Sequence, residues 1–162
     1  MIDPCVDAQI NPNSYNYTLG DRVLRLTSEF IDLQGTEEYE DCFVPESGLV
    51  LMPGECYLGS TAEVFGSHCF ASLITGRSSI GRKFVTNHIT AGLIDIGFVG
   101  RVTLEITVQR PTRVYPGVPF GQIYWFTTYG PHAAYQGKYQ GQEGPSPSRL
   151  AHEFTRGPLA AD

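Results

Sequence analysis

The sequence predicts an all-β fold, a distorted β-barrel or jelly-roll-like arrangement with only short helical turns. Apolar or alternating segments recur roughly every 8–15 residues, as in small barrels and sandwiches. Turn signals such as Pro-Gly separate these segments, and no stretch shows the period of a long helix. The chain has 162 residues, of which 41% are hydrophobic, so we expect one domain with a packed core.

The N-terminal half contains the first predicted strands. Residues 1–20 are expected to be irregular, because proline and asparagine residues that favour turns are spread through them. Arg22–Leu26 alternates charged and apolar side chains, which is typical of a half-buried strand. The acidic, polar stretch Thr36–Asp41 predicts an exposed loop. Further strands are predicted at Gly48–Met52, Cys56–Ser60 and Phe70–Ile74.

The clearest strand is Arg101–Val108, which reads Arg-Val-Thr-Leu-Glu-Ile-Thr-Val. Its even-numbered residues, all aliphatic, share one face, and Thr103, Glu105 and Thr107 share the other. Glu105 therefore points away from the apolar face. A glutamate is disfavoured in such a strand, so Glu105 is either an ordinary surface residue or a functional carboxylate. Pro116-Gly117 predicts a turn, followed by a strand over Phe120–Thr127.

Residues 130–162 are expected to form a flexible tail or lid on a β domain that spans residues 1–129. Gly130–Arg149 is rich in Gly, Gln, Pro, Ser and Tyr and poor in aliphatic residues, so it should not form core. One interpretation is a disordered tail. The other is a lid that orders over a ligand, with Lys138, Tyr139 and Gln142 as polar contacts.

Composition excludes several classes of function. A net charge of −6 disfavours non-specific nucleic-acid binding, which requires a basic surface. No apolar run is long enough to span a membrane, and no secretory signal is seen. The four cysteines form no C-x-x-C pair, so we expect free thiols in a reducing cytoplasm and no zinc site of the deaminase type.

Two groups of residues suggest chemistry on an anionic substrate. The first follows a predicted strand and combines arginines with hydroxyls, which suit phosphate; it comprises Arg77, Ser78, Ser79 and Arg82. The alternative is a surface turn with solvated arginines. The second is the carboxylate pair Asp95 and Glu105, where Asp95 is either an exposed turn residue or a group that orients water or a sugar hydroxyl. His88 is a candidate base, although a lone histidine is more often structural.

Several motifs in the same order resemble the dCTP deaminase branch of the dCTP deaminase/dUTPase superfamily. They are found over most of the chain: residues 13–20, 51–60, 76–105, 115–117, 121–123, 138–142 and 144–149. This resemblance implies a dUTPase-type fold and a homotrimer whose active sites lie between subunits. It also implies a small-molecule nucleotide substrate and catalysis without zinc.

The resemblance also implies residue roles. Ser78, Arg82, Glu105 and the carbonyl of Ala91 match positions that serve deamination, with Glu105 moving the protons. The matches to triphosphate-binding positions are Arg77, Ser79, Tyr129, Lys138 and Gln142. Phe98 would sit against the deoxyribose and disfavour a 2′-hydroxyl. Three further positions, His88, Thr90 and Gln122, are expected to contact the substrate.

One motif distinguishes subfamilies. Strict deaminases that resemble this chain carry Thr-Ala-His-Arg-Ile-Asp, whereas this chain has Thr-Ala-Gly-Leu-Ile-Asp at residues 90–95. That form resembles the bifunctional members, which convert dCTP into dUMP, ammonia and pyrophosphate. Asp95 would then orient the water that attacks the α-phosphate, with Mg²⁺ carried by the triphosphate.

Alternatives to the bifunctional deaminase remain open. They are a strict dUTP-forming deaminase, a dUTPase-like pyrophosphatase, a relative recruited to a modified or ribonucleotide substrate, and a non-catalytic nucleotide-binding protein. Two departures from the family pattern bear on assembly and substrate. The first helix that usually precedes this fold is not expected here, and Tyr15-Asn16-Tyr17-Thr18 stands where the family has Val-Asp-Val-Arg.

Overall fold

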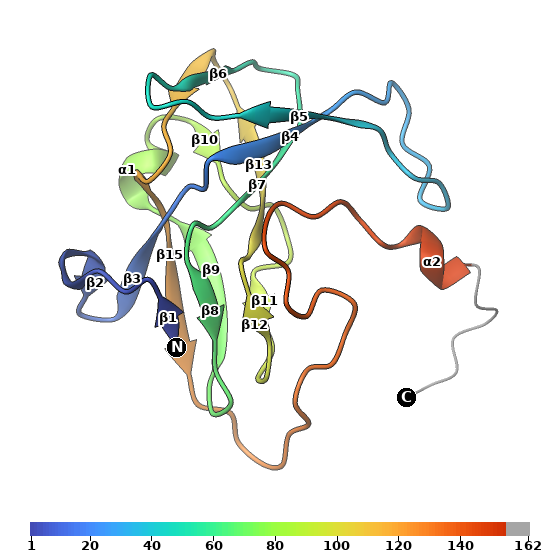
Figure 1. Cartoon of the computed structure of the whole chain (residues 1–162). Coiled ribbons are helices and arrows are strands. Elements are labelled where there is room, and N and C mark those ends of the chain that lie inside the picture. Colours follow the sequence, from blue (N-terminus) through green and yellow to red (C-terminus); the bar gives the residue numbers. More distant parts are fainter. Residues whose placement is uncertain (155–162) are drawn as a thin grey trace.

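The computed structural model describes residues 1–154 as a set of antiparallel sheets with very little helix (Figure 1). One five-stranded sheet has the order β10 (Val85–Thr86), β13 (Thr103–Val108), β7 (Tyr57–Ser60), β4 (Arg22–Leu26), β5 (Tyr39–Phe43). The other has the order β11 (Leu93–Ile94), β9 (Ala71–Gly76), β15 (Pro119–Phe126), β3 (Ser14–Thr18), β2 (Ile10–Asn11).

Two smaller sheets and three short helices complete the described chain. The three-stranded sheet joins β1 (Ile2–Asp3), β8 (Val64–Gly66) and β12 (Val99–Gly100), and the two-stranded sheet joins β14 (Thr112–Val114) to β6 (Leu49–Leu51). The helices are η1 (Asp7–Gln9), α1 (Ser78–Gly81) and α2 (Ala151–Phe154). The predicted all-β class with short helical turns is therefore confirmed. Within the described chain, no helix has the length and apolar character needed to cross a membrane.

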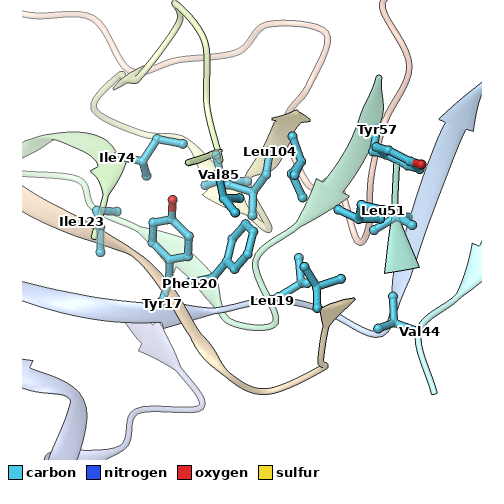
Figure 2. Packing of buried hydrophobic residues seen from close by; sticks show 14 of the residues in the cluster. Tyr17, Leu19, Val44, Leu51, Tyr57, Ile74, Val85, Leu104, Phe120 and Ile123 are labelled. Atoms are coloured by element: carbon cyan, nitrogen blue, oxygen red, sulfur yellow. The ribbon is translucent and has the colours of Figure 1, made fainter. Parts of the chain in front are cut away.

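The core lies between the two large sheets (Figure 2). Tyr17 and Ile123 from one sheet meet Leu104 from the other, and each of the three is fully buried. Strand β13 alternates as its sequence predicts: Leu104, Ile106 and Val108 are buried, while the residues between them are partly exposed. This alternation turns Glu105 out of the core.

Most predicted strands are confirmed within a residue or two, but two predictions are wrong. The first concerns residues 1–20, which contain β3, a strand between β2 and β15 with residues 15–18 all buried. Because nearly every residue of β3 is buried, the strand lacks the alternation that sequence reasoning looks for. The second concerns Tyr39–Asp41, which pairs with β4 instead of forming a loop. There Arg22 and Arg25 neutralise Asp41 and Glu40 across the strands.

The C-terminal segment, defined here as residues 130–150, docks on the strands although it has no regular secondary structure of its own. It runs beside β11 and β12 (Figure 1). Tyr135 N donates to Ile96 O over 2.7 Å, and Gly141 N donates to Val99 O over 2.9 Å. Tyr135 and Tyr139 also pack against the core, which the polar composition of the segment did not predict. That the segment moves as a lid stays a prediction, and residues 155–162 lie outside the described chain.

Candidate active site

A cavity of about 410 Å³ opens where the C-terminal segment covers β7, β13 and the connection that follows β10. The strands contribute Leu58, Thr103 and Glu105. The connection contributes His88 and Ala91, β11 contributes Leu93 and Ile94, and the segment after β11 contributes Asp95 and Phe98. Tyr135, Tyr139, Gln142, Ser146 and Ser148 close the cavity from the C-terminal segment, and Tyr39 and Val102 complete the wall. The cavity therefore brings together six of the predicted site residues: His88, Ala91, Asp95, Phe98, Glu105 and Gln142.

Glu105 is held in the wall of this cavity by its strand and by a neighbouring loop. Its backbone pairs with Leu58 of β7, which fixes the direction of the side chain. The amide of Ile89 donates to Oε2 over 2.9 Å, and the side chain keeps 33% of its surface exposed. A carboxylate that is anchored at one oxygen and open at the other can accept a proton from a bound water.

His88 lies next to this carboxylate in a more buried position. Its Nδ1 is 3.3 Å from Glu105 Oε2, while only 8% of its side chain is exposed. The contact is short enough for an ion pair when the imidazole is protonated, but it lacks hydrogen-bond geometry. Within residues 1–154 neither ring nitrogen has a hydrogen-bond partner. Buried polar atoms are normally paired, so these nitrogens are suited to bind a ligand or water in the cavity.

Asp95 reaches the cavity from a tight turn. Phe98 N donates to Asp95 O over 3.2 Å, and Gly97 between them has φ +94°, a conformation that favours glycine. The Asp95 side chain is exposed, and none of the described residues donates a hydrogen bond to its carboxylate. Asp95 therefore lies in an exposed turn, and the same turn presents its carboxylate to the cavity. Its role in orienting a water molecule stays a prediction.

The C-terminal segment is fastened where it crosses β12 and β13. Gln142 Nε2 donates to Arg101 O over 2.6 Å and to Thr103 Oγ1 over 3.1 Å, while Arg101 N donates to Gln142 O. The side-chain amide of Gln142 is thus already used to anchor the segment. Gln140 provides a second anchor, since its Oε1 accepts from Val99 N and its Nε2 donates to Gly97 O.

Eight predicted site residues do not line the cavity. Arg77, Ser78, Ser79 and Arg82 lie at α1 beyond the end of β9, with both serines and Arg82 exposed. Gln122 lies on β15, where its Nε2 donates to Ser14 and Asn16. Tyr129 is fully exposed, Thr90 is exposed in the connection between β10 and β11, and Lys138 pairs with Glu153 of α2.

The cavity wall contains two carboxylates and one histidine, but no lysine or arginine among the described residues. Residues 1–154 also contain no cluster of three or more His, Cys, Asp or Glu side chains placed to share a metal ion. All four cysteines are unpaired, as expected from their spacing. Among the described residues, the cavity wall therefore has groups for proton transfer but no lysine or arginine to neutralise a triphosphate.

Several residues of the wall were not predicted from the sequence. Tyr39 was assigned to an exposed loop, yet it is half-buried at the cavity, and burial, with a smaller contribution from Glu37, raises the pKa of its hydroxyl. The hydroxyl therefore stays neutral and able to donate a hydrogen bond. Tyr135 lies in a polar stretch that was not expected to form core, and the only sequence signal at Leu58 is that of its strand.

Comparison with known proteins identifies the family. A model of dCTP deaminase-like domains matches residues 1–128. The chain is 41% identical to a dUMP-forming dCTP deaminase of Cytophaga hutchinsonii over 157 residues, which cover 96% of this chain and 91% of the relative. It is 43% identical to a protein of the same name from Leptospira biflexa, over 96% of this chain and 90% of that one.

A solved structure supports the fold. The crystal structure of 2′-deoxycytidine 5′-triphosphate deaminase from Agrobacterium tumefaciens superposes with a TM-score of 0.64 at 21% identity, covering 79% of this chain and 43% of that one. The present chain thus spans less than half the length of that protein, and this likeness concerns the fold alone. The family match, in contrast, extends over most of the chain and includes the strands that build the cavity. The protein belongs to the dCTP deaminase-like family.

Proposed function

We propose that the protein deaminates dCTP and cleaves its triphosphate, giving dUMP, ammonia and pyrophosphate. The observation that supports this most directly is the presence of two open carboxylates, Glu105 and Asp95, in the wall of one cavity. The relatives named above carry the name dUMP-forming dCTP deaminase, which describes the same pair of reactions.

In the proposed deamination, Glu105 takes a proton from a water molecule as the water oxygen bonds to C4 of the cytosine. The carboxyl passes this proton to the ring nitrogen N3. It then takes the remaining proton of the added hydroxyl and gives it to the amino group, so that C4 becomes a carbonyl and the C4–N bond breaks to release ammonia. The amide of Ile89 keeps one Glu105 oxygen in place during these transfers. The carbonyl of Ala91, a residue of the same wall, is proposed to help hold the water.

Asp95 is proposed to act at the other end of the nucleotide. Its free carboxylate would orient a second water toward the α-phosphorus, so that the bond to the β-phosphate oxygen breaks and pyrophosphate leaves. Phe98, which follows Asp95 in the same turn, would then border the deoxyribose. A buried aromatic ring at this place leaves little room for a 2′-hydroxyl.

A second copy of the chain is proposed to supply the missing positive charge, in a homotrimer with sites between subunits. Arg77, Ser78, Ser79 and Arg82 would reach the triphosphate from the neighbouring protomer. Their position outside the cavity of their own protomer supports this arrangement. So do Ile89 and Leu93, apolar residues beside the cavity that are 60% and 58% exposed.

Magnesium is proposed to enter with the substrate. Mg²⁺ is usually bound through one or two carboxylates and the substrate phosphates, and it offsets phosphate charge. The cavity fits a cation carried by the phosphates, because its wall contains no lysine or arginine among the described residues to offset their charge. No zinc is invoked. We also propose a cytoplasmic location, since four unpaired thiols suit a reducing compartment.

Incubation of the protein with dCTP, dUTP or CTP and Mg²⁺, followed by identification of products at early times, tests this proposal. We expect dCTP to give dUMP, ammonia and pyrophosphate with little free dUTP. Release of dUTP without pyrophosphate would replace the proposal with a strict deaminase. Cleavage of dUTP alone would indicate a pyrophosphatase, and no turnover of any nucleotide would leave a binding protein.

A further inference from the structure

The rings of Phe98 and Tyr135 meet inside the cavity wall although they belong to different parts of the chain. Their centroids are 5.9 Å apart and their planes are inclined by 66°, an edge-to-face contact. Phe98 is buried and follows the turn that presents Asp95, whereas Tyr135 lies on the C-terminal segment. Both rings line the cavity, and Tyr135 packs against Phe98 within its wall.

The C-terminal segment is folded closely around Tyr135. A side chain at Gly137 would meet the Tyr135 ring at 2.5 Å, so only glycine leaves space for the ring there. The Tyr135 hydroxyl accepts a hydrogen bond from Tyr139 N over 3.2 Å. The Tyr135 backbone is equally constrained, because its amide bonds to Ile96 O and a side chain at Gly97 would meet that amide at 2.8 Å.

We propose that Tyr135 is a positioning residue for Phe98 and thereby sets the selectivity for deoxyribose over ribose. The selectivity part of this inference rests on the proposed function. With Tyr135 in place, the Phe98 ring is clamped between the core and the C-terminal segment and presents a fixed wall to the sugar. Without Tyr135, the ring gains room to move away, and a 2′-hydroxyl can be accommodated.

The contact between Tyr135 and Phe98 should also hold the C-terminal segment in place. Because Tyr135 contacts Phe98 and the backbone of Ile96, it attaches the C-terminal segment to the turn that carries Asp95. Loss of the ring should therefore loosen the segment between Gly130 and Gln142. This second consequence does not depend on any substrate.

Three variants separate the contribution of the Tyr135 ring to selectivity from that of its hydroxyl. Tyr135→Ala removes the ring, and Tyr135→Phe keeps the ring but removes the hydroxyl that accepts from Tyr139 N. Gln136→Ala is the matched control, because Gln136 is the exposed neighbour of Tyr135 and is not part of the cavity wall. For each variant, kcat/KM is measured with dCTP and with CTP, and the ratio of the two is compared with that of wild type.

We expect Tyr135→Ala to lower the dCTP-to-CTP ratio by roughly threefold to tenfold, the effect of losing one aromatic pair. Tyr135→Phe and Gln136→Ala should keep the wild-type ratio. The fraction of folded enzyme cancels from this ratio, so simple destabilisation would not change it. An unchanged ratio in Tyr135→Ala would refute the role in selectivity, and an equal loss in Tyr135→Phe would assign it to the hydroxyl rather than the ring.

Limited proteolysis tests the clamp without a nucleotide. Trypsin can cut after Lys138, which is exposed in the part of the C-terminal segment that the clamp should hold. We expect Tyr135→Ala to be cut there several-fold faster than wild type, with Gln136→Ala unchanged. Equal cleavage rates would overturn the clamp even if the protein proves inactive on dCTP, whereas a failure of the proposed function would appear in wild type as well.

Discussion

His88 Nδ1 lies 3.3 Å from Glu105 Oε2, although the two residues come from different segments. Glu105 lies on β13, and His88 lies in the connection that follows β10. The histidine is buried and its nitrogens have no hydrogen-bond partner within residues 1–154, while the carboxylate is partly open to the cavity. The pair thus combines a proton acceptor with a neighbour that can hold a ligand or a water molecule. The predictions begin with this carboxylate.

Glu105→Gln keeps the shape of the side chain and removes the proton acceptor. General acid–base catalysis contributes about 10²–10⁴-fold, so ammonia release from dCTP should fall at least that far while dCTP binding persists. An enzyme-coupled ammonia assay and a binding titration measure the two effects. Glu29→Gln, an exposed carboxylate outside the cavity, is the control. Wild-type ammonia release from Glu105→Gln would show that Glu105 is not the proton carrier.

Asp95→Asn should impair the second reaction selectively. The amide cannot orient the attacking water as the carboxylate does, so pyrophosphate release should fall far more than ammonia release. We expect dUTP to accumulate from dCTP, which mass spectrometry of early time points detects. Asp21→Asn removes an exposed carboxylate elsewhere and should behave as wild type. Equal loss of both products would mean that Asp95 positions the whole nucleotide.

Glu153→Gln should strengthen substrate binding. Lys138, a proposed triphosphate contact, forms an ion pair with Glu153 of α2 and lies over the Tyr139 ring. An exposed pair contributes about 0.2–1 kcal/mol, so releasing Lys138 should lower the KM for dCTP by at most about fivefold. Glu143→Gln removes an exposed carboxylate from the same segment as the control. A higher KM in Glu153→Gln would mean that the ion pair holds Lys138 in its active position.

Gly121→Ala should destabilise the fold. A methyl group at this position would lie 2.0 Å from the Tyr17 hydroxyl and 2.6 Å from Asn87 Nδ2, two buried groups that hydrogen-bond each other. Overpacking costs about 1–3 kcal/mol, and loss of the buried hydrogen bond adds to it. Denaturant unfolding measures the change. Gly144→Ala, which meets no atom within 4 Å, is the matched control, and similar stability of the two variants would contradict the packing argument.

Removal of residues 130–162 should abolish turnover and leave the strands folded. The truncated protein should be inactive because Tyr135, Tyr139 and Gln142 of the segment close one side of the cavity. Some stability is lost as well, since both tyrosines pack against the core. Far-UV circular dichroism checks the fold, and a truncated protein with normal kcat and KM would exclude a catalytic role for the segment.

The sequence predicted the fold class because strands such as β13 alternate clearly. It did not predict β3, whose polar residues are satisfied by partners far along the chain. Thr18 donates its amide and hydroxyl to the buried Glu63, and Asn16 Oδ1 accepts from Gln122 on β15. These contacts occupy the place of the charged pair that the family pattern contains there. Such pairing depends on the tertiary fold, so a local pattern does not reveal it.

For the site, the prediction of Glu105 and Asp95 depended on carboxylates that stand in apolar sequence, and both line the cavity. Their catalytic roles stay predictions. Tyr135 and Tyr39 were missed because each lies in a polar stretch, and only the docking of that stretch on the strands brings it to the cavity. The residues at α1 were predicted from their chemistry, and they lie outside the cavity.

A cavity wall whose described residues include two carboxylates and no lysine or arginine repels a free triphosphate. In the proposed assembly, a single protomer is therefore inactive, and an active site forms only where two copies meet. Specific activity should then rise with protein concentration until assembly is complete. In a cell, the concentration of the protein would then act as a threshold. The nucleotide would be turned over only above the concentration at which the chains assemble.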